Sequence, residues 1–335
     1  MRAAALLIAL GLMSCGCEAD RKKVPPAAGA NTRASPAARP SAEDDVPRYA
    51  TARRVVAIGD LHGDLAAAKA ALRAGGAIDD KDTWSGGDLV VVQTGDQLDR
   101  GDSERAILDL LDRLTEEAKK AGGALHALNG NHEIINVALD FRYVTEGGFK
   151  DFVDVPGASL ADPKLASLPV NARPRGAAFL PGGPYAKRIA PRHLAVMIGD
   201  TVFVHGGVLP KHVRYGLGKM ERQVRAWMEG KEPAPPSIVT SEDGPVWTRR
   251  YSAAPDAQDC AVLNETLEAL AAKRMVVGHT VQRGGISAGC NKKVWRIDVG
   301  LAAHYGGPTE VLEIIDNEAR VIRAQGATPP GALPP

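Results

Sequence analysis

Gly59-Asp60-Leu61-His62-Gly63-Asp64 follows directly after Val55 to Ile58, an apolar run typical of a buried β-strand. Asp60 and His62 occupy alternate positions where that strand should end, so both side chains can lean toward one point in space. Carboxylate oxygen and imidazole nitrogen are common ligands of divalent metal ions. We therefore expect a polar site at the end of this strand.

Four later blocks have the same character, and most of them also follow a short hydrophobic run. They are Gly95-Asp96-Gln97-Leu98-Asp99-Arg100-Gly101, Gly130-Asn131-His132-Glu133, His205-Gly206-Gly207 and Gly278-His279-Thr280. Unrelated packing requirements would not place so many candidate ligands at successive strand ends. Together the five blocks indicate a hydrolytic centre that holds two metal ions.

Short apolar runs alternate with amphipathic stretches along the first half of the chain. We expect strands at 53–58, 89–93 and 124–128, and helices at 65–74 and 103–120. This alternation predicts an α/β fold with the site at strand ends.

Regularity is lost at 140–192, where Gly, Pro and Arg are frequent, and we expect a loop-rich cap inserted there. Beyond it, a hairpin should present His205, helices should follow, and a further strand should lead to His279. The expected elements are the hairpin 195–198 with 201–204, helices 214–229 and 264–272, the strand 274–277, and a closing β-meander of 293–298, 310–316 and 319–323.

The N-terminus has the charged start, short apolar middle and small-residue exit of a secretory signal. Leu12-Met13-Ser14-Cys15 resembles a bacterial lipobox, in which Cys15 is lipidated; an ordinary cleaved signal is the alternative. We expect an exported, periplasmic lipoprotein whose only contact with the membrane is this anchor. The expected segments are the signal 1–17, a disordered tether 18–50, the globular domain 51–326 and a disordered tail 327–335.

Composition limits the classes of partner. The 335 residues carry 41 basic and 40 acidic side chains, for a net charge of +1, and no long basic stripe occurs. These features give no electrostatic basis for binding nucleic acid. In an oxidising compartment Cys260 and Cys290 could form a disulfide, but their spacing leaves two unpaired thiols equally open.

Two ions held close together need one ligand that bridges them, and a carboxylate can do so. We assign Asp96 as the bridge. The remaining ligands are Asp60 and His62 for one ion, and Asn131, His205 and His279 for the other. A shared water or hydroxide, with its pKa lowered by both ions, is the expected nucleophile.

Other residues of the blocks suit proton transfer and phosphate binding. His132 is placed to protonate a leaving oxygen, and Asp99 could orient its imidazole. Arg100 offers a planar fork of donors to a phosphoryl group, and Arg249 or Arg142 could supply a second clamp.

The blocks Gly-Asp-x-His-Gly, Gly-Asp-x-x-Asp-Arg-Gly, Gly-Asn-His-Glu, His-Gly and Gly-His resemble the phosphoprotein phosphatase branch of the calcineurin-like metallophosphoesterases, over about residues 55–300. Residues 95–102, 131–137 and 141–144 look most similar to the bacterial Shewanella-like phosphatases. The resemblance implies a four-layer fold, a central β-sandwich flanked by helices, and two divalent metal ions, manganese first with iron or zinc as alternatives. It also implies phosphomonoester hydrolysis, the six ligand roles assigned above, and the acid role of His132.

The expected substrate is therefore a phosphoprotein or a small phosphomonoester. Two alternatives stay open. One is a nucleotide or diadenosine polyphosphate hydrolase of the same superfamily, whose members share the early blocks. The other is a catalytically silent binding module on a lipid anchor, against which the intact His132 and the full ligand set argue.

Overall fold

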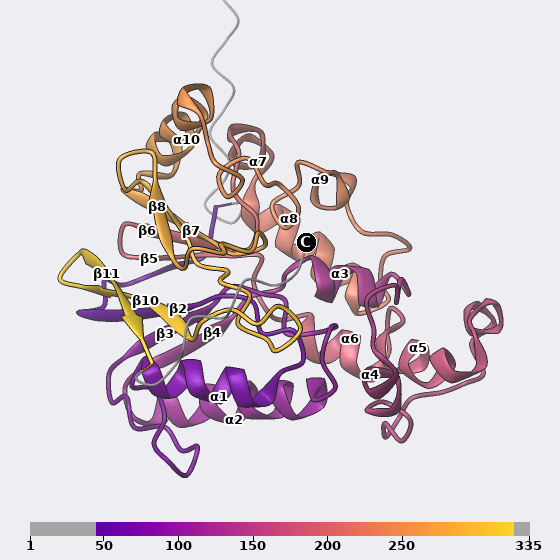
Figure 1. Cartoon of the computed structure of the whole chain (residues 1–335). Helices are drawn as coiled ribbons and strands as arrows, with labels where there is room; N and C mark the ends of the chain where they lie inside the picture. The colour runs from indigo at the N-terminus through magenta and orange to yellow at the C-terminus, as the bar shows by residue number, and fades with distance from the viewer. Residues whose placement is uncertain (1–44, 325–335) are drawn as a thin grey trace, which may run out of the picture. The chain divides into compact units, whose positions relative to one another are not determined.

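The computed structural model describes residues 45–324, and within that range the chain forms two mixed β-sheets (Figure 1). One has five strands in the order β11-β10-β2-β3-β4, and the other has six in the order β1-β5-β6-β7-β9-β8. The strands are β1 (Arg48–Tyr49), β2 (Arg54–Ile58), β3 (Val90–Gln93), β4 (Ala124–Ala127), β5 (Ala195–Ile198), β6 (Thr201–Val204), β7 (Arg274–Val277), β8 (Ser287–Gly289), β9 (Val294–Arg296), β10 (Glu310–Ile315) and β11 (Glu318–Arg323).

The α-helices range from single turns to the long amphipathic α2. They are α1 (Leu65–Ala74), α2 (Glu104–Lys120), α3 (Asn131–Val137), α4 (Glu146–Lys150), α5 (Arg173–Phe179), α6 (Pro184–Ile189), α7 (Pro210–Tyr215), α8 (Leu217–Met228), α9 (Ser237–Thr240) and α10 (Ala257–Leu270). Within residues 45–324, no helix combines the length and the apolar character needed to cross a lipid bilayer.

Both sheets deliver site residues at the ends of parallel strands. In the first, β2, β3 and β4 are parallel, and Asp60, Asp96 and Asn131 follow their carboxyl ends. In the second, β6 and β7 are parallel, and His205 and His279 follow theirs. Because carboxyl ends of parallel strands meet at one edge of a sheet, residues far apart in sequence come together there.

The two sheets pack face to face through one apolar layer. Ala57 and Val92 pair in register and so share one face of the first sheet, and they belong to the same buried cluster as Phe203 and Val276, which pair in the second. On the outer side of the second sheet, Val204 and Met275 pack with residues of α8 and α10, while α1 and α2 lie along the first sheet (Figure 1). The expected helix-flanked β-sandwich is confirmed.

The three strands of the predicted closing β-meander are present, but they do not form one meander. β9 pairs in parallel with β7, in the six-stranded sheet, whereas β10 pairs with β2 and β11 in the other. Apolar alternation marks a strand but carries no information on which sheet accepts it.

Helix boundaries also differ from the predicted ones. The expected helix 214–229 divides into α7 and α8 at Gly216. Its φ of 98° is a backbone conformation that glycine adopts readily and other residues rarely adopt. α10 begins at Ala257, earlier than expected, because the carboxylate of Asp256 accepts a hydrogen bond from the Asp259 backbone N–H and caps it. The expected loop-rich segment 140–192 contains the short helices α4, α5 and α6, which are five to seven residues long and too short to show a helical period.

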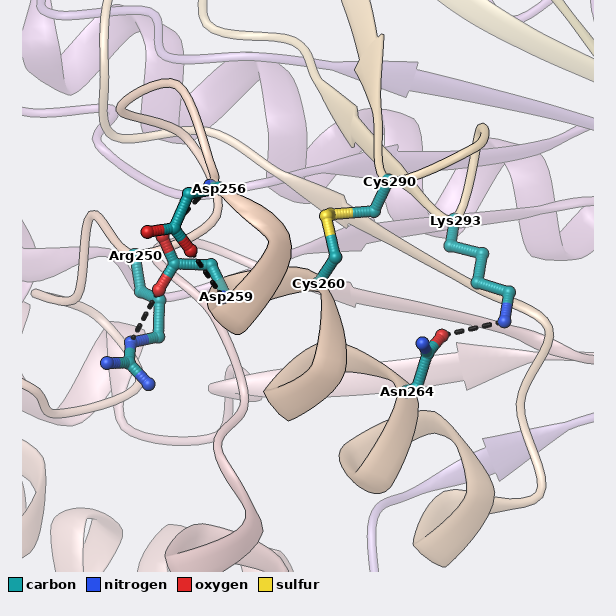
Figure 2. The surroundings of a disulfide bond; sticks show 7 residues. All are labelled: Arg250, Asp256, Asp259, Cys260, Asn264, Cys290 and Lys293. Carbon is teal, nitrogen blue, oxygen red and sulfur yellow. Dashed lines mark hydrogen bonds and ion pairs between the residues drawn. A yellow bond between two sulfur atoms is a disulfide. The ribbon is translucent and has the colours of Figure 1, made fainter.

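Cys260 and Cys290 form a disulfide, which settles the alternative left open by their spacing. Figure 2 shows that it joins α10 to the segment between β8 and β9, near the ion pair of Arg250 with Asp259. The predicted signal, most of the tether, the tail and Cys15 lie outside the described residues.

Candidate metal centre

The structure brings the predicted ligands together at the shared edge of the two sheets. None of Asp60, His62, Asp96, Asn131, His205 and His279 is more than 7% exposed. His62 Nε2 lies 4.0 Å from Asp60 Oδ2 and 3.8 Å from Asp96 Oδ2. The other oxygen of Asp96, Oδ1, lies 3.3 Å from His205 Nε2, so this carboxylate stands between two groups of donors.

The second group is equally compact. His205 Nε2 lies 2.8 Å from Asn131 Oδ1 and 3.1 Å from His279 Nδ1. His205 Nδ1 lies 2.9 Å from the Thr94 carbonyl oxygen, which orients the ring so that Nε2 faces the centre.

Two groups of side chains within residues 45–324 have ligand atoms close enough to share an ion, within 4.8 Å of one another. They are His62, Asp96 and His132, and Asp96, His205 and His279. The donors are carboxylate oxygens and imidazole nitrogens, which suit a divalent ion. Asp96 belongs to both groups.

The charge of the cluster fits the same conclusion. Burial and the carboxylate of Asp298 raise the pKa of Asp60 well above its usual range. Burial likewise raises the pKa of Asp298 to about 6. Acids packed this closely repel one another unless cations offset their charge, so the cluster is suited to divalent ions.

Several site residues have an unusual backbone. His62, Asp96, Asp99, Arg100 and His279 all have positive φ, between 45° and 68°. Non-glycine residues seldom adopt this conformation, and such strain is found most often at functional sites. The turns after the strands thus aim these side chains at a cost in local conformational energy.

Glycines within the blocks allow close approach to the carboxylates. A Cβ atom at Gly130 would lie 2.2 Å from Asp96 Oδ1, and one at Gly278 would lie 2.4 Å from Asp60 Oδ1. Both distances are far below van der Waals contact, so a side chain at either position would displace a carboxylate.

His132 and Asp99 form a buried pair beside this cluster. His132 Nδ1 lies 2.5 Å from Asp99 Oδ2, and His132 Nε2 lies 3.7 Å from Asp96 Oδ2. Burial lowers the pKa of His132, but the carboxylates of Asp96 and Asp99 outweigh it and raise that pKa to about 9. The imidazole can therefore carry the proton that an acid needs.

Arg100 and His62 both line a cavity of about 1050 Å³. The guanidinium carbon of Arg100 lies 4.3 Å from the ring centroid of Tyr143, and its buried Nε has no hydrogen-bond partner among the described residues. Thr145 and His304 also line the cavity. An anion in this cavity would find a positioned cation beside the candidate ligands.

The structure does not bring the two other proposed clamps into this cavity. Arg142 has a side chain 66% exposed and pairs with Asp140. Arg249 donates to the His279 carbonyl oxygen at 2.7 Å and to Thr280 Oγ1 at 2.8 Å, and so supports the loop that carries His279. Neither is among the described residues that line the cavity.

Sequence reasoning assigned no role to Glu133. Its fully buried carboxylate accepts hydrogen bonds from the backbone N–H groups of Gly130, Asp96, Gln97 and Leu98. It thereby joins the loop after β3 to the start of α3. Its place in the block Gly130-Asn131-His132-Glu133 was the signal that could have found it.

Arg175 and Asn136 were also missed. The guanidinium of Arg175, which belongs to α5, lies beside Asp99 and Asn136 and is fully buried. No sequence pattern links Arg175 to them, because Asp99 lies 76 residues and Asn136 lies 39 residues before it.

The fold and the donor set define a metal-dependent phosphatase. Residues 53–283 match the family model for calcineurin-like phosphoesterases, and the chain belongs to this family. The relatives place it in the phosphoprotein phosphatase branch, together with the Shewanella-like phosphatases.

Two relatives cover most of the chain. Shewanella-like protein phosphatase 2 of Arabidopsis thaliana is 39% identical over 84% of this chain and 81% of its own length. Shewanella-like protein phosphatase 1 of Plasmodium berghei is 30% identical over 81% of this chain and 74% of its own length.

Among solved structures, a cold-active protein tyrosine phosphatase superposes with a TM-score of 0.67 at 24% identity, over 83% of this chain and 79% of its own. A serine/threonine phosphatase of Saccharomyces cerevisiae gives a TM-score of 0.51 at 13% identity, over 84% of this chain and 85% of its own. These likenesses concern the fold.

Proposed function

We propose that this phosphatase hydrolyses phosphomonoesters, with phosphorylated proteins as the principal substrate, and that His132 is the general acid. The observation that carries the proposal is the 2.5 Å contact of His132 Nδ1 with Asp99 Oδ2, which turns Nε2 toward the ligand cluster. An imidazole held in this way can give its Nε2 proton to an oxygen at the cluster.

The contacts described above support the proposed ligand roles. Asp60, His62 and Asp96 would hold one ion, and Asp96, Asn131, His205 and His279 the other. When bound, a pair of divalent ions supplies Lewis acidity and lowers the pKa of water, so that a nucleophile forms near neutral pH. We propose manganese as the native metal, with iron or zinc as alternatives.

The protein's own residues then handle the phosphoryl group and the leaving oxygen. Arg100 binds the non-bridging phosphate oxygens, since its guanidinium faces the cavity beside His62. A water oxygen would form a bond to phosphorus as the bond from phosphorus to the leaving oxygen breaks. The leaving oxygen keeps the electron pair of the broken bond and takes the proton from His132 Nε2. Asp99 stabilises the imidazole through this transfer.

A substrate panel on purified protein tests the proposal, with metal content measured on the same sample. Phosphopeptides and aryl phosphates should be hydrolysed, and diadenosine tetraphosphate should be a poor substrate. A strong preference for diadenosine tetraphosphate would favour the nucleotide hydrolase alternative. Metal-loaded protein that turns over no phosphoester would favour a silent binding module.

We also propose that the chain is exported and anchored in the periplasm through lipidated Cys15, on the basis of the lipobox-like sequence. Labelled fatty acid should enter the wild-type chain and not a Cys15→Ala variant. Equal labelling of both would refute the anchor.

A further inference from the structure

Arg175 connects the 140–192 insertion to the candidate acid. It lies on α5, and its side chain is fully buried. Its guanidinium carbon lies 4.7 Å from the ring centroid of Phe152 and 5.0 Å from that of Phe179. Water does not reach this position, so the hydrogen bonds of the guanidinium are weakly screened.

The guanidinium uses its planar fork to contact several groups at once. Nε donates to Asn136 Oδ1 at 2.8 Å, and Nη2 donates to Asp99 Oδ1 at 3.3 Å. Nη1 donates to the Gly148 carbonyl oxygen at 3.1 Å and pairs with Glu104 Oε2 at 2.5 Å. Glu104 in turn accepts from the Asp99 backbone N–H at 2.8 Å.

Asn136 links the guanidinium of Arg175 to Asp99 and to the backbone of His132. Because its Oδ1 accepts from Arg175, its Nδ2 must face the other way, where it donates to Asp99 Oδ1 at 3.0 Å and to the His132 carbonyl oxygen at 2.9 Å. Asp99 Oδ1 is thus held by two donors, and Oδ2 is left to meet His132 Nδ1.

We propose that Arg175 is a positioning residue for catalysis, which acts through Asp99 and Asn136 to hold His132 in the orientation that protonates the leaving oxygen. This proposal rests on the proposed acid role of His132. It also gives the insertion a part in the reaction, because the residue that completes the arrangement lies on α5 (Figure 1).

The test compares two esters that differ in their need for an acid. The leaving group of 2,4-dinitrophenyl phosphate departs without protonation, whereas that of phenyl phosphate needs a proton. Arg175→Lys keeps the charge but loses the fork. We expect kcat on phenyl phosphate to fall about ten-fold, and kcat on the dinitrophenyl ester to change less than about two-fold, with metal content unchanged.

Two further variants keep the test decisive if Arg175→Lys folds poorly. The double variant Glu104→Gln with Arg175→Met removes one charge of each sign, and Asn136→Leu leaves the ion pair of Arg175 with Glu104 in place. Both should show the same selective loss on phenyl phosphate. Arg105→Met is the matched control. Arg105 contacts the insertion at Asp151 and Asp154 without touching Asp99, and its loss should not alter the ratio of the two rates.

The variant His132→Ala distinguishes a failure of the Arg175 proposal from a failure of the proposed acid role of His132. If His132→Ala is selective for phenyl phosphate but the Arg175 and Asn136 variants slow both esters equally or neither, Arg175 is merely structural and the inference is overturned. If His132→Ala itself shows no selective loss on phenyl phosphate, the proposed acid role of His132 is overturned, and the positioning role of Arg175 is overturned with it. Combining His132→Ala with Arg175→Lys should add no further selective loss, since both changes would act on one proton transfer.

Discussion

The carboxylate of Glu133 reaches across from α3 to the backbone of Asp96, where its Oε2 accepts the Asp96 N–H at 2.8 Å. The same oxygen accepts the Gly130 N–H at 2.7 Å, and Oε1 accepts the Gln97 N–H at 2.9 Å. One buried carboxylate therefore fixes the turn that aims the candidate bridging ligand.

Glu133→Gln should weaken metal binding about 10- to 100-fold, the usual effect of removing a group that orients a ligand. In this variant an amide nitrogen at position 133 would face backbone N–H groups that need an acceptor. A metal titration of the apo-protein measures this change. Glu117→Gln is the control, because Glu117 also accepts a backbone N–H, from Trp84, and its side-chain contacts are with Trp84 and Arg113 rather than with a candidate ligand. Equal affinities in wild type and Glu133→Gln would contradict the role.

Asp96→Asn and His132→Ala should have different effects. Asp96→Asn would weaken the proposed bridging ligand, which belongs to both groups of candidate ligands, and should lower both metal content and activity. His132→Ala should keep its metal and lose roughly a hundred-fold in turnover, as expected for a lost general acid. Elemental analysis and kinetics on the same samples measure whether the two variants differ in this way. Because the His132 nitrogens lie within reach of the His62 and Asp96 ligand atoms, equal metal loss in both variants would make His132 a ligand instead.

Arg100→Ala should raise the inhibition constant of inorganic phosphate and lower kcat/KM by about 10- to 100-fold, since a charge-assisted hydrogen bond contributes about 1.5–3 kcal/mol. Arg214→Ala is the control, an exposed arginine that pairs with Glu265. Unchanged phosphate inhibition in Arg100→Ala would remove Arg100 from the phosphate site.

His212 should make the fold sensitive to acid. It is fully buried, its Nδ1 accepts the Leu209 N–H at 3.0 Å, and burial together with Lys211 lowers its pKa from 6.5 to about 4. The unfolded chain binds this proton more readily, so stability should fall as pH drops from about 6.5 toward 4, by up to about 3 kcal/mol.

His212→Asn retains an acceptor that does not titrate. Urea unfolding at a series of pH values should show a smaller loss for this variant than for the wild type. Parallel stability curves for the two proteins would show that His212 is not the group responsible.

The disulfide should contribute to stability rather than to chemistry. Cys260 and Cys290 are separated by 30 residues, and closing a loop of this length stabilises a fold by about 3–4 kcal/mol in the chain-entropy model. Dithiothreitol should therefore lower the free energy of unfolding of the wild type. It should leave the Cys260→Ser/Cys290→Ser variant unchanged. A wild type that is indifferent to reductant would contradict this contribution.

The sequence alone determined the family, the fold class and the positions of most strands. Each of those conclusions depends on local information: an apolar run of strand length, followed by a short polar block such as Asp60 with His62. Such blocks also predicted which side chains would gather at the strand ends, and the structure places all six within one buried cluster.

Only the tertiary structure decided which sheet receives β9, whether Cys260 pairs with Cys290, and what surrounds Asp99. Arg175 belongs to no motif, nothing local in the stretch 131–137 shows what Asn136 contacts, and the short helices of the insertion are set by packing rather than by a periodic pattern. A hydrogen bond between residues 76 positions apart, like that of Arg175 with Asp99, leaves no trace in local sequence. Its geometry exists only once the chain has folded and excluded water from both groups.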